Sequence, residues 1–419
     1  MITRRGLLTA AGGSVAVLGT AGLARAWQQG LILFSPDSGL AAWDDWNQRR
    51  FSGPLALVSA GVLASSPHNT QPWRFAVGRY GVDVFEVPER NLGAMDPFGR
   101  ERLAGLGGAI HSMALATTSI GRAAVVRLLP DAGNPQHVAR LELGPEGDAP
   151  PPLHPLVRAI GRRHTDRRAW RGGGIAPEDL RAIAGTAGSE LVRIDLITPG
   201  SQAGQRFAAL TVDATQAIAG DAYMMAASQR WMRHGPRAWA EAQDGLSPAT
   251  SGIPAWQATA AAMLPPLSPE TEGRFWVEAT RDTALPTASM FALISVADPW
   301  DRRSALLAGM AWQRLHLTAV TLGLAAQPLN QIPEMIDRER QLGRPPGFAR
   351  AAAALLPEEG WRPTFALRLG HPPDLAPASV RRPVSAVMGP PARLGYDVER
   401  SAAETRSQQE QLDRRQAAK

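Results

Sequence analysis

The sequence contains no cysteine, which excludes a disulfide, a thiolate metal site and a cysteine nucleophile. It also lacks an HExxH metal motif, a GxSxG nucleophile turn and a Walker A phosphate loop. Gly105 and Gly107 begin a dinucleotide-like pattern, but Ile110 stands where the third glycine belongs. The eight histidines are scattered, and we expect structural or surface roles for them. We therefore predict no metal site and no dinucleotide fold.

Lysine is almost absent, because Lys419 is the only one, and arginine carries nearly all of the positive charge. The net charge is +6 and the isoelectric point is about 10.6. No dense basic block or basic helix accompanies this charge, so we predict no nucleic-acid partner. Small arginine clusters suit phosphate instead, because a guanidinium presents a fork of donors.

Long apolar runs are missing after the N-terminus, so we expect no stable membrane span in the mature protein. Residues 1–26 combine Arg4-Arg5 with a weakly apolar stretch and end in Ala24-Arg25-Ala26. This pattern indicates a twin-arginine (Tat) signal for the export machinery, with cleavage favoured over a retained anchor. The prediction is a periplasmic or otherwise exported protein, which is membrane-associated if the signal is retained.

An internal repeat joins residues 96–124 to residues 298–326, at a constant offset of 202 and without a gap. Nine of the 29 aligned positions are identical, and both copies open with Asp-Pro and an aromatic residue. Chance similarity between two alanine-rich helices is the alternative, but the shared opening and the shared glycines Gly121 and Gly323 favour a repeat. Each copy predicts a buried helix with Asp at its N-cap, Pro at its first position and Gly at its end.

Strand patterns flank each predicted helix, which makes each half an α+β unit. The candidate strands are residues 82–87 and 138–143 in the first half and 291–296 and 364–369 in the second. We divide the chain into a signal at 1–26, a linker or helix at 27–53, a first half at 54–150, a second half at 151–395 and a polar tail at 396–419. Residues 200–285 are an insertion rich in Met and Trp, which predicts helical core or a lid.

Two polar stretches and a short arginine pair are the candidate functional residues. SSPHNTQPW, residues 65–73, follows an apolar helix and contains Ser66, Asn69 and Gln71, which suit a polar ring edge or a phosphate. RRHTDRRAW, residues 162–170, alternates Arg163, Thr165 and Arg167, which an extended segment would place on one side. An ordinary loop and a solvated basic turn are the alternatives. Arg381 and Arg382 form the pair.

Together these stretches resemble the signatures of the nitroreductase superfamily. SSPHNTQPW is similar to the family pattern PSxxNxQPW, and RRHTDRRAW is similar to RRSxR. PLNQIPE at residues 328–334 and LRLG at residues 367–370 also fit, so the resemblance spans roughly residues 55–383. The exported, fused arrangement is most similar to the Acg-type FMN-binding branch. In a typical member each chain carries both signatures, and two chains pair to build the FMN sites.

Here the serine-asparagine signature stands only in the first half and the complete arginine signature only in the second. Arg49-Arg50-Phe51 reads as a decayed arginine signature. The resemblance therefore implies a nitroreductase-like α+β fold of two degenerate halves, which form a pseudo-dimer within one monomer with a single FMN site.

The resemblance also implies a role for each candidate residue. Arg163, Thr165 and Arg167 would contact the FMN phosphate and the N1/O2 side of its ring. Ser66, Asn69 and Gln71 would hold ring and phosphate from the first half, and Arg382, or alternatively Arg381, would close on the phosphate. Chemistry would occur at flavin N5 without a catalytic side chain. The implied function is two-electron reduction of an electron-poor small molecule; a flavin-holding protein with a lid and little turnover is the alternative, and a relic without flavin is a third.

Overall fold

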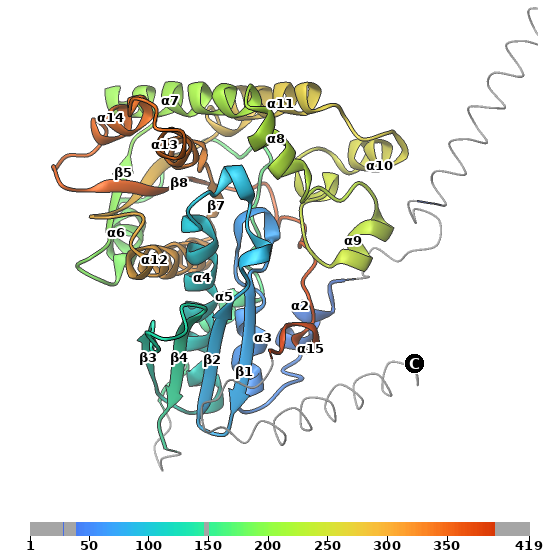
Figure 1. The fold of residues 1–419 in the computed structure, drawn as a ribbon, viewed down its shortest axis with the longest axis vertical. Helices are drawn as coiled ribbons and strands as arrows, with labels where there is room; N and C mark the ends of the chain where they lie inside the picture. Colours follow the sequence, from blue (N-terminus) through green and yellow to red (C-terminus); the bar gives the residue numbers. More distant parts are fainter. Residues whose placement is uncertain (1–27, 29–38, 146–150, 390–419) are drawn as a thin grey trace, which may run out of the picture.

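A computed structural model describes residues 28, 39–145 and 151–389 (Figure 1). The predicted signal at 1–26 and the polar tail at 396–419 lie outside the described residues. Two antiparallel sheets of four strands, with helices around and between them, make up the described chain. The predicted α+β class is therefore confirmed.

The first half contains the sheet β1-β2-β4-β3. Its inner strands β2 and β4 match the two strands that the sequence predicted, whereas the outer strands β1 and β3 were not predicted. The elements of this half are α2 (Ala41–Asn47), α3 (Pro54–Gly61), β1 (Trp73–Gly78), β2 (Gly81–Glu86), α4 (Arg100–Ala116), β3 (Ala124–Leu128) and β4 (His137–Leu143).

The second half repeats this arrangement in the sheet β5-β6-β8-β7. Even an irregularity is repeated: the ladder shifts between Val84 and Phe85 in β2 and between Ile294 and Ser295 in β6. The elements outside the insertion are α5 (Val157–Ile160), α6 (Pro177–Ala184), β5 (Arg193–Ile197), β6 (Met290–Val296), α12 (Arg302–Thr321), β7 (Ala325–Pro328), α13 (Gln331–Gln341), α14 (Gly347–Ala353), β8 (Arg362–Gly370) and α15 (Val384–Val387).

The repeated helices α4 and α12 pack against each other through glycine. A β-carbon on Gly107 would lie 2.1 Å from the carbonyl oxygen of Leu306, and one on Gly309 would lie 2.0 Å from that of Ala104. Gly107 and Gly309 are separated by the repeat offset of 202, and so are Ala104 and Leu306. The contact is therefore reciprocal, as in a two-fold interface. The repeat therefore lies at the contact between the halves.

The predicted start of these helices was wrong. α4 begins at Arg100 after Gly99, and α12 begins at Arg302 with Asp301 as its N-cap, so the prolines lie before the helices. Asp96 still serves α4, because its carboxylate accepts from the backbone N–H groups of Glu101 and Arg102 at 3.1 and 2.9 Å. The predicted glycines Gly121 and Gly323 both adopt left-handed φ, at 69° and 73°, where the helical segments end.

Residues 100–120, which include α4, are long and apolar enough to cross a bilayer, and 78% of the relevant window is buried inside the protein. Since α4 is packed between the first sheet and α12, we interpret it as a core helix.

The insertion has two parts with different surroundings. α7 belongs to the core of the second half, since Phe207 stacks on Phe291 of β6 with ring centroids 4.6 Å apart. The segment from α8 to α10 extends along one side of the molecule toward the first half (Figure 1). The insertion helices are α7 (Gln202–Ala219), α8 (Ala222–Gln229), α9 (Pro236–Ala242), α10 (Ala255–Met263) and α11 (Pro269–Glu278).

Candidate functional site

The SSPHNTQPW stretch, which we call the signature turn, leads from α3 to β1 through a 3₁₀ turn, Pro67–Asn69. His68, Asn69 and Gln71 have positive φ values of 43°, 55° and 49°, a conformation that non-glycine residues adopt at a cost. The Ser66 hydroxyl accepts from the backbone N–H of Gln71 at 2.9 Å and closes the turn. Such a strained backbone persists only where surrounding contacts stabilise it. Asn69 and Gln71 make these contacts.

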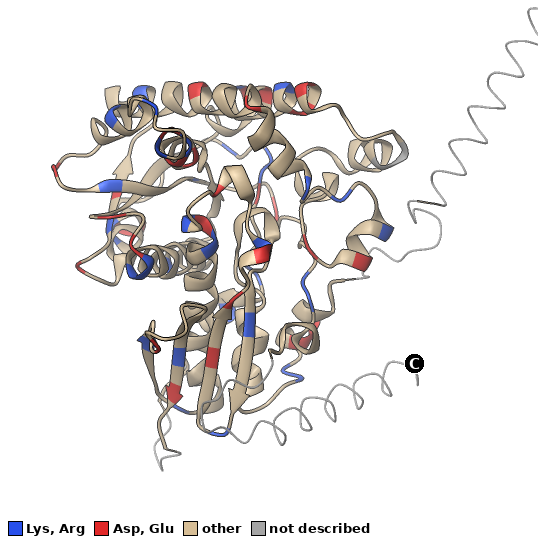
Figure 2. Cartoon of the chain, in the orientation of Figure 1, with Lys and Arg blue, Asp and Glu red and all other residues tan. Residues whose placement is uncertain are grey.

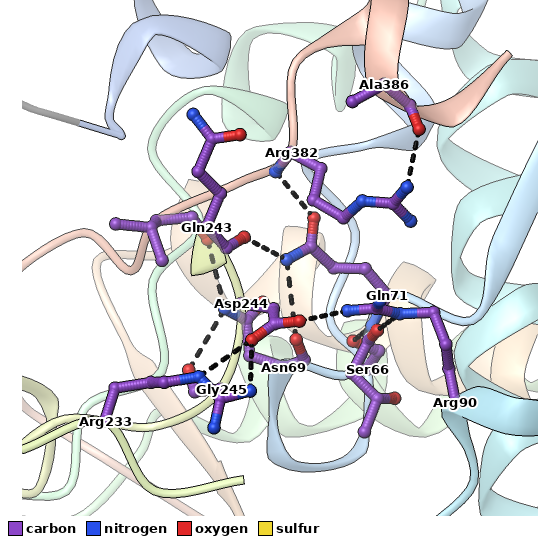
Figure 3. Close-up of polar contacts among 12 residues, drawn as sticks. Ser66, Asn69, Gln71, Arg90, Arg233, Gln243, Asp244, Gly245, Arg382 and Ala386 are labelled. Atoms are coloured by element: carbon purple, nitrogen blue, oxygen red, sulfur yellow. Dashed lines mark hydrogen bonds and ion pairs between the residues drawn. The ribbon is translucent and has the colours of Figure 1, made fainter. Parts of the chain in front are cut away.

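Asn69 is buried, and both the oxygen and the nitrogen of its side-chain amide are hydrogen-bonded. Its Oδ1 accepts from Arg381 Nη1 at 2.8 Å, and its Nδ2 lies within donating distance of the carbonyls of Val380 (3.1 Å) and Gly245 (3.2 Å). Gln71, also buried, donates to the carbonyl of Gln243 at 2.7 Å and accepts from the backbone N–H of Arg382 at 2.8 Å. The signature turn therefore joins the insertion to the C-terminal arginine pair (Figure 3).

The second half also reaches the signature turn through α12. Trp312 Nε1 donates to Ser65 Oγ at 2.8 Å, and Gln313 Nε2 donates to Ser112 Oγ of α4 at 3.0 Å. The site is thus built at the contact between the two halves.

Arg163, in the RRHTDRRAW stretch, is 2% exposed. It donates from Nη2 to the carbonyl of Leu63 at 3.0 Å, and its Nη1 lies 3.4 Å from His316 Nδ1. Its Nε is buried without a partner among the described residues. Burial lowers the pKa of Arg163 to about 10, because nothing nearby offsets the loss of water around the charge.

Arg381 is a second buried guanidinium, 3% exposed. It donates to Asn69 and to the carbonyls of Val380 (2.9 Å) and Ala64 (3.3 Å), but its Nε too has no partner among the described residues. Burial, and then the charge of Arg163, hold the pKa of Arg381 well below its ordinary value. Two buried like charges without a carboxylate are unfavourable on their own, and they suit an anion.

The other predicted residues lie around these two. Arg167 donates from Nη1 to the carbonyl of Thr250 at 3.0 Å, and burial lowers its pKa to about 10. Thr165 is half-buried. Arg382 is half-buried, donates to the carbonyl of Ala386 at 2.5 Å, and has a pKa lowered by burial to about 10.

The carboxylates nearest to this cluster already serve other arginines. Asp166 pairs with Arg168 at 2.9 Å. Asp244 pairs with Arg233 at 2.6 Å and also with Arg90 (Figure 3). None of the ion pairs found in the described part of the chain includes Arg163, Arg167 or Arg381.

Several residues at the site were not predicted. His68, in the signature turn, lies 2.9 Å from Ser228 Oγ of the insertion, and burial followed by the charge of Arg167 lowers its pKa to about 4. His316 is fully buried against Arg163. Arg368 donates to the backbone of Arg168 at 2.8 Å and lies 3.7 Å from the ring centre of Trp170. The repeat alignment gave one indication of His316. The first copy has Ala114 at the equivalent position, so the histidine is a difference between the two copies.

The fold and the arginine cluster define an α+β protein with a site suited to an anion between its halves. No family model matches the sequence. A protein called "Putative NAD(P)H nitroreductase Rv3131" from Mycobacterium tuberculosis H37Rv is 28% identical over 349 residues, which cover 81% of this chain and 91% of that protein. "Putative NAD(P)H nitroreductase acg" from the same strain is 30% identical over 146 residues, covering 34% and 43% respectively.

Solved nitroreductases also resemble parts of the structure. The FMN-dependent nitroreductase NfnB from Mycobacterium smegmatis, solved with NADPH, has 19% identity and a TM-score of 0.33 over 57% of this chain and 96% of its own. A nitroreductase with bound FMN from Desulfitobacterium hafniense DCB-2 has 12% identity and a TM-score of 0.35 over 57% and 100%. Over four-fifths of its length the chain is thus similar to mycobacterial proteins that are named putative NAD(P)H nitroreductases, in agreement with the resemblance that the sequence predicts.

Proposed function

We propose that this chain is an exported FMN-binding oxidoreductase of nitroreductase type, which reduces an electron-poor small molecule by two electrons. The observation that carries the proposal is the pair Arg163 and Arg381, two buried guanidiniums with unpartnered Nε atoms and no carboxylate. The relatives' names, which describe NAD(P)H nitroreductases, supply the reaction class.

The donor set fits FMN. A phosphate dianion offsets the positive charge of the cluster and accepts from guanidinium forks, which suits Arg381 and Arg382 at one end of the site. Arg163 and Arg167 would face the phosphate and the electron-accepting edge of the ring, with Thr165 between them. When bound, FMN supplies two-electron redox chemistry at its N5 atom, and nearby positive charge stabilises the reduced ring.

Binding of FMN and of riboflavin tests this assignment, because riboflavin lacks the phosphate. The wild-type chain should bind FMN more tightly, and Arg382→Ala should lose most of that preference while keeping its riboflavin affinity. Arg167→Ala should weaken both ligands if it faces the ring. Equal affinity of the wild-type chain for both flavins would remove the phosphate assignment.

A second candidate function is a protein that holds FMN with little turnover. The contacts of the insertion with the signature turn favour it: Gln243 and Gly245 cover Gln71 and Asn69, Thr250 meets Arg167, and Ser228 meets His68. Anaerobic addition of NADH, NADPH or dithionite to the flavin-loaded protein distinguishes the two functions. Rapid bleaching by a nicotinamide supports the reductase, and slow bleaching even by dithionite supports the covered site.

The split signatures and the reciprocal contact of α4 with α12 support an intramolecular pseudo-dimer with one FMN site per chain. A monomer by light scattering with one bound flavin is the expected result. A flavin site that forms only in an intermolecular dimer would contradict it.

The Arg4-Arg5 pattern supports export in the folded state by the twin-arginine machinery to the periplasm or an equivalent compartment. Replacing both arginines by lysine should retain the protein in the cytoplasm. Unchanged export of that variant would contradict the proposal.

A further inference from the structure

An uncharged segment runs through the insertion. Between Asp244 and Glu270 the chain has 25 residues without a single Asp, Glu, Lys or Arg, although one residue in five of the whole chain is charged. The segment includes α10, which lies at the outer edge of the molecule (Figure 1). In Figure 2 the ribbon of α10 carries neither blue nor red.

Large apolar side chains of this segment face solvent. Trp256 is 70% exposed, Leu264 59%, Leu267 47% and Ile253 38%. We call residues 251–267 the uncharged arm. A cluster of this kind on a protein that has a large core of its own marks an interaction surface, since it is costly to leave in water.

The absence of charge identifies the partner. A protein interface surrounds its apolar centre with a polar and charged rim, whereas a segment that enters the headgroup and acyl boundary of a bilayer must leave no charge there. Tryptophan at such an edge suits the membrane interface, because its ring is apolar and its N–H is polar.

The start of the described chain supports the same partner. A β-carbon on Gly39 would lie 3.9 Å from the α-carbon of Ala240 in α9, so the chain enters beside the insertion. Upstream, residues 6–24 contain no Asp, Glu, Lys or Arg. The described chain thus begins next to α9, the helix that precedes the uncharged arm.

We propose that the uncharged arm docks this protein on a phospholipid bilayer, with Trp256 and Leu264 inserted at the interface. This inference does not depend on the proposed flavin chemistry. It has a consequence for the site, because Thr250, which meets Arg167, is three residues before Ile253 of the arm. The surface that would face the membrane and the residue that contacts Arg167 therefore belong to the same loop.

The absence of cysteine permits a direct test in the full-length chain. Leu264→Cys is labelled with an environment-sensitive fluorophore and mixed with vesicles of phosphatidylcholine and phosphatidylglycerol. The matched control is Val125→Cys, since Val125 is 58% exposed in β3 of the other half. We expect a blue-shifted, brighter emission at position 264 and no change at position 125. No shift at 264, or a shift that grows with protein concentration without vesicles and so reports a second copy, would overturn the proposal.

Vesicle co-sedimentation of Trp256→Asp/Leu264→Asp adds a second readout. Both side chains are exposed, so the fold and flavin binding should be unchanged, while vesicle affinity should fall at least tenfold. If this variant binds vesicles as tightly as the wild type, all membrane binding belongs to the N-terminal stretch, and the proposal that the uncharged arm docks on the bilayer is refuted. Loss of flavin binding in the wild-type chain would affect the proposed function and leave this result untouched.

Discussion

Arg381 Nη1 donates to Asn69 Oδ1 across 2.8 Å and joins two residues that lie 312 positions apart. The hydrogen bond brings the C-terminal arginine pair onto the signature turn of the first half. It also leaves the guanidinium buried beside Arg163 with no acid to balance either charge. A ligand that carries negative charge would remove this imbalance of charge.

Replacing Arg163 by Met should remove flavin binding without lowering the stability of the flavin-free protein. The native side chain makes few hydrogen bonds for a buried charge, so an apolar side chain of similar length should leave the free energy of unfolding unchanged or raise it by about 1–2 kcal/mol. Denaturant unfolding of the flavin-free variant measures this.

Arg100→Met is the matched control for that variant. Arg100 is equally buried, at 2% exposed, but it is paired with Asp337 at 2.7 Å and with Glu101 at 3.3 Å. Removing it leaves buried carboxylates unpaired, so the free energy of unfolding should fall by about 3–5 kcal/mol. Similar losses in the two variants would show that Arg163 is an ordinary structural arginine.

Gly309→Ala should destabilise the contact between the halves. Its β-carbon would lie 2.0 Å from the carbonyl oxygen of Ala104, and backbone cannot move away as a side chain can. We expect a loss of about 1–3 kcal/mol in the free energy of unfolding, as for an overpacked core. Gly185→Ala, where an added β-carbon meets nothing within 4 Å, should change stability little. Tolerance of Gly309→Ala would contradict the close approach of α4 and α12.

The contribution of Glu101 to stability should fall as the pH rises from about 4.5 to about 7, against the opposite contribution of buried histidines such as His68. Burial raises the pKa of Glu101 from 4.5 to about 7, so the folded chain keeps a proton there that the unfolded chain has released. The contribution of this group is complete below pH 4.5 and is lost as the pH passes 7. Glu101→Gln should flatten that part of the profile of unfolding free energy against pH, whereas Glu89→Gln, at an exposed position, should leave it unchanged. An unchanged slope in Glu101→Gln would assign the pH dependence to another group.

Asp244→Asn should speed the release of FMN. Asp244 holds the loop that covers the signature turn through Arg90 and Arg233, so losing its charge loosens that loop. An increase of about tenfold in the dissociation rate corresponds to about 1.4 kcal/mol, the scale of one partly buried ion pair. Asp282→Asn, in an exposed pair with Arg281, serves as the control in a stopped-flow measurement. Equal release rates in the two variants would show that this loop does not retain the ligand.

The central helices and inner strands were predictable because they are buried and repeated. The offset of 202 aligned α4 with α12, and the strand patterns at residues 82–87 and 291–296 identified β2 and β6. The outer strands β1, β3, β5 and β7 were missed. β3, β5 and β7 have four or five residues and several half-exposed side chains, and β1 directly follows the signature turn. The helix starts were misplaced because Asp96 caps α4 from a preceding turn.

The candidate site was predictable in its parts and not in its connections. The signature turn and the arginines Arg163 and Arg381 stood out by composition, and the structure brings them together. The partners that place them, such as His316 and the carbonyl of Gly245, come from segments far along the chain. Tertiary packing brings these partners to the site, and no local pattern in the sequence encodes it.

The visible absorption spectrum of the purified protein, reconstituted with FMN and freed of excess ligand, tests the central claim most directly. We expect one flavin per chain in the wild type and none in Arg163→Ala/Arg167→Ala, with the far-ultraviolet circular dichroism unchanged between them. A wild-type chain that retains no flavin, or a double variant that retains as much as the wild type, would contradict the account.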